Sequence, residues 1–381
     1  MRIIEVVGKS LERQFLELPF SIYKNDPNWI CPLLNDIDAV FDPSKNNFFS
    51  FGKCNRWLLV DDNQHPVGRI AAFINEKKAF KEDLPTGGCG FFECIDDQLA
   101  AKMLFDQAKS WLIGMGMEAM NGPINFGEND MWWGLLIEGF QEPFYGMNYN
   151  PPYYKVLFEQ YGFKVRYEQI SNSIDVRKGL PEKVIKISKW VAKRNGYTFR
   201  HLETSDIPKY SRDFKEVYND AWKDFEHFTA VTDATIEETI RKIKPVMDPN
   251  LIWFAYTNEN EPVAFIMILP DTNELIKGLN GKLDLLGKLR FLWNKMTVKH
   301  TRMRAVIMGT KELYRNQGLE SALFMKLQEY AHSLGHYREL ELSWVGDFNA
   351  KMIAVHHAIG ATFSKKHATY FITFNDNNSL V

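Results

Sequence analysis

The hydrophobic positions of the chain change repeatedly between a period of two residues and a period of three to four, which predicts alternating strands and helices. A short apolar run at 2–7 predicts a first strand, and two apolar runs separated by a polar turn at 57–68 predict a β-hairpin. Residues 99–116 and 150–162 carry apolar side chains at helical spacing and each stretch ends at a glycine, which predicts two helices. This order of elements is typical of a mixed sheet flanked by helices.

The same order of elements recurs in the second half of the chain. Four matched positions are separated by 195, 196, 219 and 198 residues: Tyr23 and Tyr218, Trp57 and Trp253, Gly116 and Gly335, and Gly162 and Gly360. The changing offset predicts an insertion of about 20 residues in each half, since loops accept such changes. We therefore expect two tandem α/β domains, each with a mixed, mostly antiparallel sheet, at 1–178 and 179–381.

Composition and charge narrow the classes of function. The formal net charge of −2 provides no field that would gather nucleic acid, so we expect no such partner. The charges within the first nine residues do not fit a signal peptide, and no apolar run reaches about 18 residues, which predicts a cytoplasmic protein. The cysteines lack CxxC spacing, so we expect buried, reduced thiols and no metal site at Cys31, Cys54, Cys89 and Cys94.

The segment Tyr-Arg-Asn-Gln-Gly-Leu-Glu-Ser-Ala-Leu at 314–323 resembles the phosphate loop of the GCN5-related N-acetyltransferase (GNAT) superfamily. Arg315 and Gly318 fit the superfamily pattern, whereas Glu320 stands where a glycine or alanine is usual. In such a loop, glycine allows the backbone to approach the pyrophosphate of CoA, whose charge lies against free N–H groups at a helix N-terminus. The departure at Glu320 leaves open whether its carboxylate repels that anion or points outward and favours the helix dipole.

The resemblance implies an acyl-CoA site in the second half. We expect the acyl-CoA to contact the end of the preceding strand, the loop and the start of the last helix: Met308, Gly309, Thr310, Arg315, Asn316, Gln317, Gly318, Leu319, Glu320, Ser321 and Asn349. His356 occupies the position of a tyrosine that often protonates the departing thiolate, and it is either such an acid or an ordinary helix residue. Alternation at 337–344 places Glu341 on one strand face, where it either accepts the proton of an amine or forms a salt bridge.

The first half lacks the phosphate loop and has Phe158 at the tyrosine position, so we expect it to be catalytically silent. Its insertion combines glycine and proline with polar and aromatic residues, which is typical of ligand sites but also of packed loops. From this insertion and the second half we expect substrate contacts by Asn125, Asn129, Trp133, Tyr153 and Trp344.

The second insertion, at about 273–304, is basic and amphipathic. Between Ile276 and Arg304 it has eight cationic residues against Asp284 alone, interleaved with leucines and aromatic residues. Four roles are open for such a segment. It covers an acyl channel, binds the phosphates of CoA, lies weakly on an anionic membrane surface, or packs as a lid with its charges in water.

Together these features predict an acyltransferase that moves an acyl group, such as acetyl, from acyl-CoA to an amine, without a metal. The tandem arrangement also looks like that of the Fem-type aminoacyl transferases and the N-myristoyltransferases, so the donor is acetyl-CoA or a longer acyl-CoA. Two alternatives are a non-catalytic GNAT-fold binding module and a peripheral membrane protein, each without CoA binding.

Overall fold

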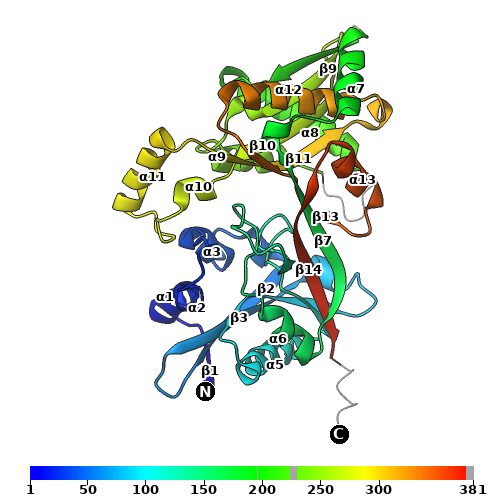
Figure 1. Cartoon of the computed structure of the whole chain (residues 1–381). Helices are drawn as coiled ribbons and strands as arrows, with labels where there is room; N and C mark the ends of the chain where they lie inside the picture. The colour runs from blue at the N-terminus through cyan, green and yellow to red at the C-terminus, as the bar shows by residue number, and fades with distance from the viewer. Residues whose placement is uncertain (195, 224–229, 375–381) are drawn as a thin grey trace.

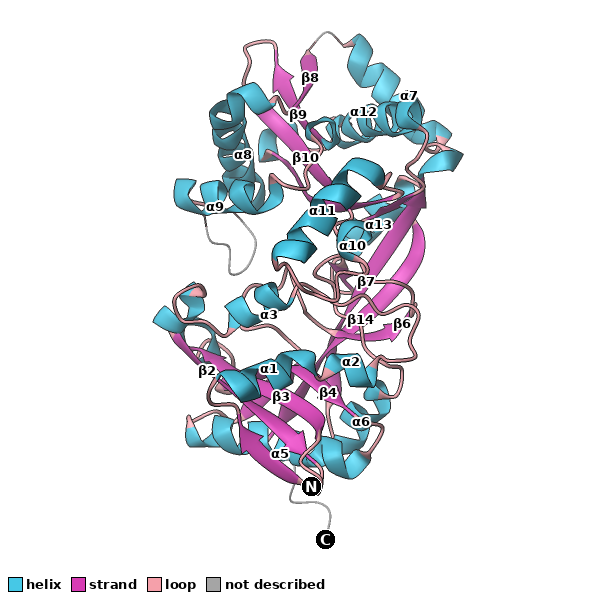
Figure 2. Cartoon of the chain, turned by 90° about the vertical axis from the view of Figure 1, so that its left-hand side faces the viewer, coloured by secondary structure: helices cyan, strands magenta, loops and turns pink. Residues whose placement is uncertain are grey.

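The computed structural model describes residues 1–194, 196–223 and 230–374. In this part of the chain, fourteen strands form one continuous sheet, and helices pack on both of its faces in each half (Figure 1, Figure 2). The strands of the first half are β1 (Arg2–Glu5), β2 (Gly52–Val60), β3 (Pro66–Asn75), β4 (Thr86–Cys94), β5 (Ala119–Gly122), β6 (Leu135–Glu138) and β7 (Lys164–Asp175). Those of the second half are β8 (Tyr197–His201), β9 (Ile252–Thr257), β10 (Pro262–Pro270), β11 (Arg302–Thr310), β12 (Glu339–Glu341), β13 (Val345–Gly346) and β14 (Thr362–Thr373).

The helices follow the predicted repeat. In the first half they are α1 (Lys9–Glu17), α2 (Pro19–Ile22), α3 (Leu34–Val40), α4 (Glu76–Ala79), α5 (Gln98–Gly114) and α6 (Tyr154–Tyr161). In the second half they are α7 (Glu182–Lys193), α8 (Ile207–Trp222), α9 (Asp233–Ile243), α10 (Asn273–Ile276), α11 (Leu285–Thr297), α12 (Leu319–Leu334) and α13 (Ala350–Ala358). The 3₁₀ turns among the described residues are η1 (Asn47–Ser50), η2 (Val176–Lys178), η3 (Thr204–Asp206), η4 (Pro249–Leu251) and η5 (Glu312–Tyr314).

The two halves exchange their last strands. The sheet order is β1-β2-β3-β4-β5-β14-β7-β12-β11-β10-β9-β8, so β14 from the end of the chain joins the first half and β7 joins the second. The red β14 and the green β7 run side by side between the two lobes in Figure 1, and they pair antiparallel over most of their length. The predicted boundary at 178 falls directly after β7, and the division into 1–178 and 179–381 stays a prediction because each half completes the sheet of the other.

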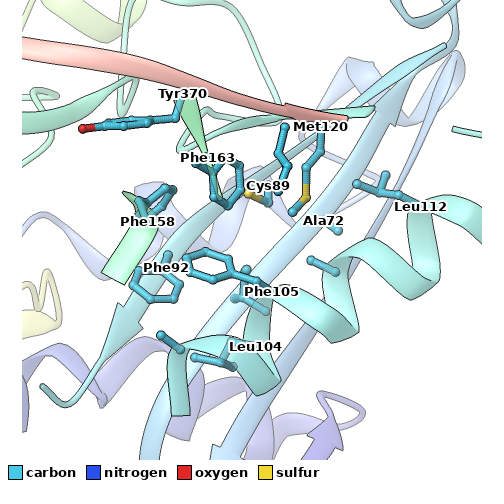
Figure 3. Close-up of a cluster of buried hydrophobic side chains, with 14 of the residues drawn as sticks. Ala72, Cys89, Phe92, Leu104, Phe105, Leu112, Met120, Phe158, Phe163 and Tyr370 are labelled. Atoms are coloured by element: carbon cyan, nitrogen blue, oxygen red, sulfur yellow. The ribbon is translucent and has the colours of Figure 1, made fainter. Parts of the chain in front are cut away.

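The core of the first half shows the exchange in its side chains. Phe92, Phe105 and Phe158 pack together with ring centroids 4.7–5.3 Å apart, and Tyr370 of β14 lies against Phe158 at 5.6 Å (Figure 3). Phe158, which occupies the tyrosine position in the first half, is therefore a fully buried core residue. Burial of aromatic rings contributes strongly to folding, so β14 stabilises the half of the chain that is more distant in sequence.

The cysteines are free thiols, and three of the four are buried while Cys54 is half-buried. Burial raises the pKa of all four thiols to about 12, which makes them unreactive at neutral pH. Among the described residues, no group of histidine, cysteine or acidic side chains is arranged to hold a metal ion. No helix in the same part of the chain is long and apolar enough to cross a bilayer.

Candidate active site

The parallel strands β11 and β12 separate near the middle of the sheet. Arg302, Met303 and Arg304 pair with Glu339, Leu340 and Glu341, after which β12 ends. The chain then turns towards β7, where the amide of Leu342 donates to the carbonyl of Asn172 at 2.8 Å. This turn shortens the strand predicted at 337–344. Beyond Arg304, β11 continues to Thr310 along β10 alone. On its other side Ser343 Oγ donates to the carbonyls of Ala305 and Val306, and the strand edge after Val306 faces a gap between the strands.

Polar side chains gather on one face of the sheet below this gap. Met303 and Leu340 point to the apolar core of the second half, so alternation puts Arg304 and Glu341 on the opposite face. The register of β7 with β12 and β14 brings four further side chains to that face. We call this group the polar centre: Arg304, Glu341, Gln169, Ser171, Lys365 and His367.

The polar centre is buried and incompletely hydrogen-bonded. Five of its side chains are at most 1% exposed, and only Arg304 is half-buried. Among the described residues, the following side-chain atoms have no hydrogen-bond partner: Arg304 Nε, Glu341 Oε1, Gln169 Nε2, Ser171 Oγ and His367 Nδ1. Buried polar atoms are normally paired, and a cluster of exceptions is typical of a site that binds polar groups.

Glu341 forms the central ion pair of this group. Lys365 Nζ donates to Glu341 Oε2 at 2.5 Å, and both side chains are buried. The Arg304 guanidinium also interacts with the Glu341 charge, while its Nη1 donates to the carbonyl of Tyr145 at 3.0 Å. Two cations therefore neighbour one carboxylate, and Glu341 Oε1 is left as an unpartnered acceptor.

His367 provides the second available acceptor. Its Nε2 lies 2.9 Å from the carbonyl oxygen of Asn148, which only accepts, so Nε2 carries the proton and Nδ1 has a free lone pair. Burial lowers the pKa of His367 to about 4. The imidazole is therefore neutral at pH 7, with its lone pair directed into the polar centre.

The first insertion covers the polar centre, as the sequence suggests, but through backbone atoms. The carbonyls of Tyr145 and Asn148 bind Arg304 and His367. Gly134 approaches so closely that a Cβ at this position would lie 2.2 Å from Gln169 Oε1, and its φ of 82° also favours glycine. Sequence reasoning missed these contacts, because a backbone carbonyl leaves no mark in residue type.

The five predicted substrate residues are not brought together. Trp133 Nε1 donates to the hydroxyl of Tyr167 at 2.9 Å, and the Tyr153 hydroxyl donates to the carbonyl of Cys94 at 2.7 Å. Asn125 is buried beside an aromatic cluster, Asn129 is exposed, and Trp344 is half-buried just after β12. Their role in binding substrate stays a prediction.

The predicted phosphate loop joins η5 to α12 with the backbone that such a loop requires. Asn316 and Gly318 have φ values of 63° and 79°, and Gly318 caps α12 without a side-chain hydrogen bond. Consecutive turns of this kind, at the start of a 16-residue helix, direct N–H groups towards an anion. A Cβ at Gly318 would lie 2.5 Å from Ile187 Cγ2, so glycine is also required by packing.

The polar side chains of this loop are hydrogen-bonded to neighbouring parts of the protein. Arg315 Nη2 donates to the carbonyl of Ala221 at 2.8 Å, and Gln317 Oε1 accepts from the Tyr197 hydroxyl at 2.5 Å. The carboxylate of Glu320 accepts from Thr310 Oγ1 at 2.7 Å, which turns it towards the end of β11 and away from bulk solvent. Leu319 is buried in the core below the loop, while Met308 and Ser321 are half-buried and Gly309 is buried on β11.

The structure separates His356 from Glu341. His356 lies on α13, whose N-cap Asn349 accepts from the amide of Met352, and its Nδ1 is 3.1 Å from Asn172 Nδ2. Asn172 and Ser171 are neighbours on β7, so alternation places His356 and the polar centre on opposite faces of that strand. Burial lowers the pKa of His356 to about 4, which leaves no imidazolium proton for a thiolate at neutral pH. The acid role of His356 stays a prediction that this arrangement does not support.

Comparison with known proteins supports the fold. Residues 214–361 match the model of the Acetyltransferase (GNAT) family. A tandem GNAT protein from the clavulanic acid biosynthesis pathway aligns with a TM-score of 0.56 at 11% identity, over 98% of both chains. A GCN5-related N-acetyltransferase from Sphaerobacter thermophilus aligns with a TM-score of 0.55 at 11% identity, over 97% of this chain and 95% of that one.

The chain therefore has the tandem GNAT fold, and its second half matches the GNAT family model. Its sequence is 29% identical to that of a bacterial ceramide synthase from Caulobacter vibrioides over 380 residues, 97% of each chain. It is 26% identical to protein YghO of Escherichia coli over 376 residues, 96% of this chain and 93% of that one. The fold and the superfamily predicted from the sequence are confirmed, and the comparisons support acyltransferase activity.

The first GNAT domain differs from the second at the corresponding helix. The side chain of Asp97 caps α5 by accepting from the amide of Ala100 at 2.9 Å, so a carboxylate occupies the position of an anion site. Below it, Glu93 is buried and accepts hydrogen bonds from Tyr23, Tyr154 and Arg69 at 2.9, 2.8 and 3.3 Å. Burial raises the pKa of the Glu93 carboxyl, against the opposing effect of Arg69.

A cavity of about 90 Å³ lies beside Glu93, and its lining includes none of the six polar-centre residues. Its wall is mostly apolar and aromatic, and it includes Phe144 and Asn148 of the first insertion. Asn148 binds His367 through its carbonyl, and the Phe144 ring centroid lies 5.0 Å from Lys365 Nζ. The cavity of the first GNAT domain and the polar centre therefore share a wall.

Proposed function

We propose that the protein is an N-acyltransferase that transfers a fatty acyl group from acyl-CoA to the amino group of a long-chain amino alcohol. The relative that supports this substrate class is named a bacterial ceramide synthase and aligns over 97% of both chains. A ceramide is an amide of a long-chain amino alcohol, so the name fits both the donor and the acceptor classes that we infer.

The observation that carries the proposal is the pair of buried, unpartnered acceptors, Glu341 Oε1 and His367 Nδ1. An amino alcohol presents an amine and a hydroxyl, each of which needs an acceptor in a buried site. We assign the amine to Glu341 and the hydroxyl to His367. The apolar residues of the adjoining cavity then face only the first methylene groups of the acceptor's hydrocarbon chain, since the cavity of about 90 Å³ has no room for more.

The polar centre supplies the groups that direct transfer requires. The ammonium group of the acceptor loses its proton to Glu341, and the amine nitrogen attacks the thioester carbonyl carbon. The carbonyl oxygen becomes an oxyanion, which the charge of Lys365 and the free Nε–H of Arg304 stabilise. When the C–S bond breaks, the nitrogen gives its second proton to the departing CoA thiolate, so that the amide and the CoA thiol are the products.

The gap between β11 and β12 and the loop Arg315–Ser321 are assigned to acyl-CoA. The backbone edge of β11 after Val306 offers hydrogen bonds to an extended chain, and the N-terminus of α12 offers N–H groups to a pyrophosphate. Thr310 holds the Glu320 carboxylate at the end of β11, beside this loop, so the N–H groups of the loop must offset the repulsion between that charge and the pyrophosphate. Such a donor is consistent with the cytoplasmic location predicted from the sequence.

The proposal is tested by measuring amide formation by mass spectrometry and CoA release with a thiol-reactive dye. We expect an amide from palmitoyl-CoA and sphinganine, and much slower reactions with acetyl-CoA or with ethanolamine as the acceptor. Glu341→Gln should lower turnover by at least a hundredfold. Glu339→Gln is the matched control, since Glu339 is on the same strand face but pairs with Arg302 and is half-buried. Equal rates with ethanolamine and sphinganine would contradict the acceptor class.

The non-catalytic alternative is tested by calorimetry with CoA itself. We expect saturable binding by the parent protein, weakened when Gly318 is replaced by alanine. Absence of binding at millimolar CoA would favour a binding module that has lost its donor.

A further inference from the structure

Helix α11 presents an apolar face to solvent. Its outward side chains are 55–83% exposed: Leu285, Leu286, Leu289, Leu292, Trp293 and Met296. At 3.6 residues per turn these positions span about 120° of the helix surface. We call this surface the α11 apolar face. Figure 1 shows α11 projecting from the left of the molecule, and Figure 2 looks directly onto that side.

The other side of α11 is attached to the protein, so the exposed face is a fixed feature of the fold. Phe291 and Leu283 pack on a small apolar cluster that includes Ile30 and Ile276. Asn294 Nδ2 donates to the carbonyl of Leu275 at 2.7 Å. Asp284 caps the helix by accepting from the amide of Gly287 at 2.8 Å.

Cationic side chains border the α11 apolar face. Lys288 and Lys295 follow one edge of the apolar arc and Arg290 the other, as their positions on the helix require. Lys282 and Lys299 continue this charge beyond the two helix ends. Within the described residues, none of the four lysines forms an ion pair, and all four are exposed.

We infer that α11 docks the protein on an anionic lipid bilayer, with its axis in the membrane plane. Leucine, methionine and tryptophan on one face, with lysine and arginine at its edges, match the helices that lie at the boundary between lipid headgroups and acyl chains. Trp293 has the amphipathic ring that prefers this boundary. The free lysines then lie at the height of the anionic headgroups, where they are attracted electrostatically.

The size and charge of the face argue against a second copy of the chain as the occupant. A stable dimer buries about 800 Å² and 20–30 residues on each partner. The α11 apolar face has six residues, and stacking two copies would bring their lysine-bordered helices together. Neither the small area nor the charge prevents binding to a bilayer. One apolar strip is enough for a bilayer, and anionic headgroups carry the charge opposite to that of the lysines.

The docking helix is also close to the proposed acceptor cavity. Ile30 belongs both to the cluster beneath α11 and to the cavity wall, and Asn273 at the start of α10 lines the same cavity. The use of this contact to take a lipid acceptor from the membrane rests on the proposed function, whereas docking itself does not.

Flotation of the full-length protein with vesicles tests the inference without any turnover. The probes are phosphatidylcholine vesicles with and without phosphatidylglycerol, at low and high salt. We expect the parent protein to float with the anionic vesicles. Leu289→Ser/Leu292→Ser/Trp293→Ser should reduce bound protein at least tenfold, and Lys288→Glu/Lys295→Glu should remove the preference for anionic lipid.

The controls separate docking from general stickiness and from misfolding. Leu313→Ser replaces a leucine that is 86% exposed elsewhere, and Lys189→Glu/Lys193→Glu reverses two exposed lysines on α7; both should float like the parent. All replaced residues are exposed, so melting temperatures should be unchanged. The inference is overturned if the parent does not float, or if the triple serine variant floats equally well. Dimerisation lost in that variant, without flotation of the parent, would assign the face to a second copy.

Discussion

Replacing Lys365 with methionine leaves the Glu341 carboxylate buried without its partner. Lys365 and Glu341 are 1% and 0% exposed, and their charged atoms are 2.5 Å apart. Removing one member of such a pair costs about 3–5 kcal/mol of unfolding free energy, because a buried charge remains uncompensated. That is a large part of the 5–15 kcal/mol, roughly, by which a folded domain is stable. Urea denaturation followed by fluorescence measures this cost.

The double variant Glu341→Gln/Lys365→Met separates stability from catalysis. Without either charge, most of the lost stability should return, to within about 1 kcal/mol of the parent, since uncharged replacements of buried pairs are often neutral. Turnover should nevertheless stay at least a hundredfold lower, because glutamine cannot accept the amine proton. If the double variant retained a tenth or more of the parent's activity, Glu341 would be a structural residue only. An unchanged denaturation midpoint in Lys365→Met would refute the stabilising role of the pair.

Three further predictions concern other parts of the molecule. Gly318→Ala should destabilise the protein by about 1–2 kcal/mol in urea denaturation and weaken CoA binding in calorimetry, because its φ of 79° and its contact with Ile187 exclude a Cβ; unaltered binding would contradict the loop assignment. The pKa of His356 is about 4 in the folded protein and about 6.5 in the unfolded chain. The unfolded chain therefore binds the proton first, and His356 lowers the unfolding free energy of the parent by roughly 3 kcal/mol as the pH falls from 6.5 to 4. His356→Phe lacks this loss, and parallel stability curves for the two proteins between pH 7 and pH 4 would refute the shift. Ile372→Ala should cost about 2–5 kcal/mol and speed hydrogen exchange in β5 and α5, since Ile372 is buried in the core of the first half; faster exchange confined to the second half would contradict the strand exchange.

The fold could be predicted from the sequence because hydrophobic period and glycine stops are local signals. The helix expected at 99–116 is α5 at Gln98–Gly114, and the one expected to end at Gly360 is α13. The exchange of β7 and β14 left no such signal. Both strands mix charged, polar and apolar residues, which does not specify one neighbour, and the choice among partners depends on contacts between residues up to about 200 positions apart.

Some residues of the candidate site could likewise be predicted from the sequence, and others could not. Gly318 and Asn316 were visible because a phosphate loop needs particular backbone conformations, which few residue types adopt. Glu341 was visible as a carboxylate on an alternating strand. His367 and Lys365 were not, because they lie on a strand that the repeat assigns to the second half but that joins the sheet of the first half. The contacts of Tyr145 and Asn148 use carbonyl oxygens, which every residue has.

The origin of the polar centre explains why a degenerate first domain is kept. Arg304 and Glu341 come from the sheet of the second domain, while Lys365 and His367 come from the strand that completes the first. The insertion that covers these side chains belongs to the first domain. A single GNAT domain would leave Glu341 open to water on one side, where its pairing with Lys365 would be screened. The first half contributes a lid and a cavity wall, and the strand β14 that completes its sheet contributes a counter-ion. These are the parts that exclude water from the proposed transfer reaction.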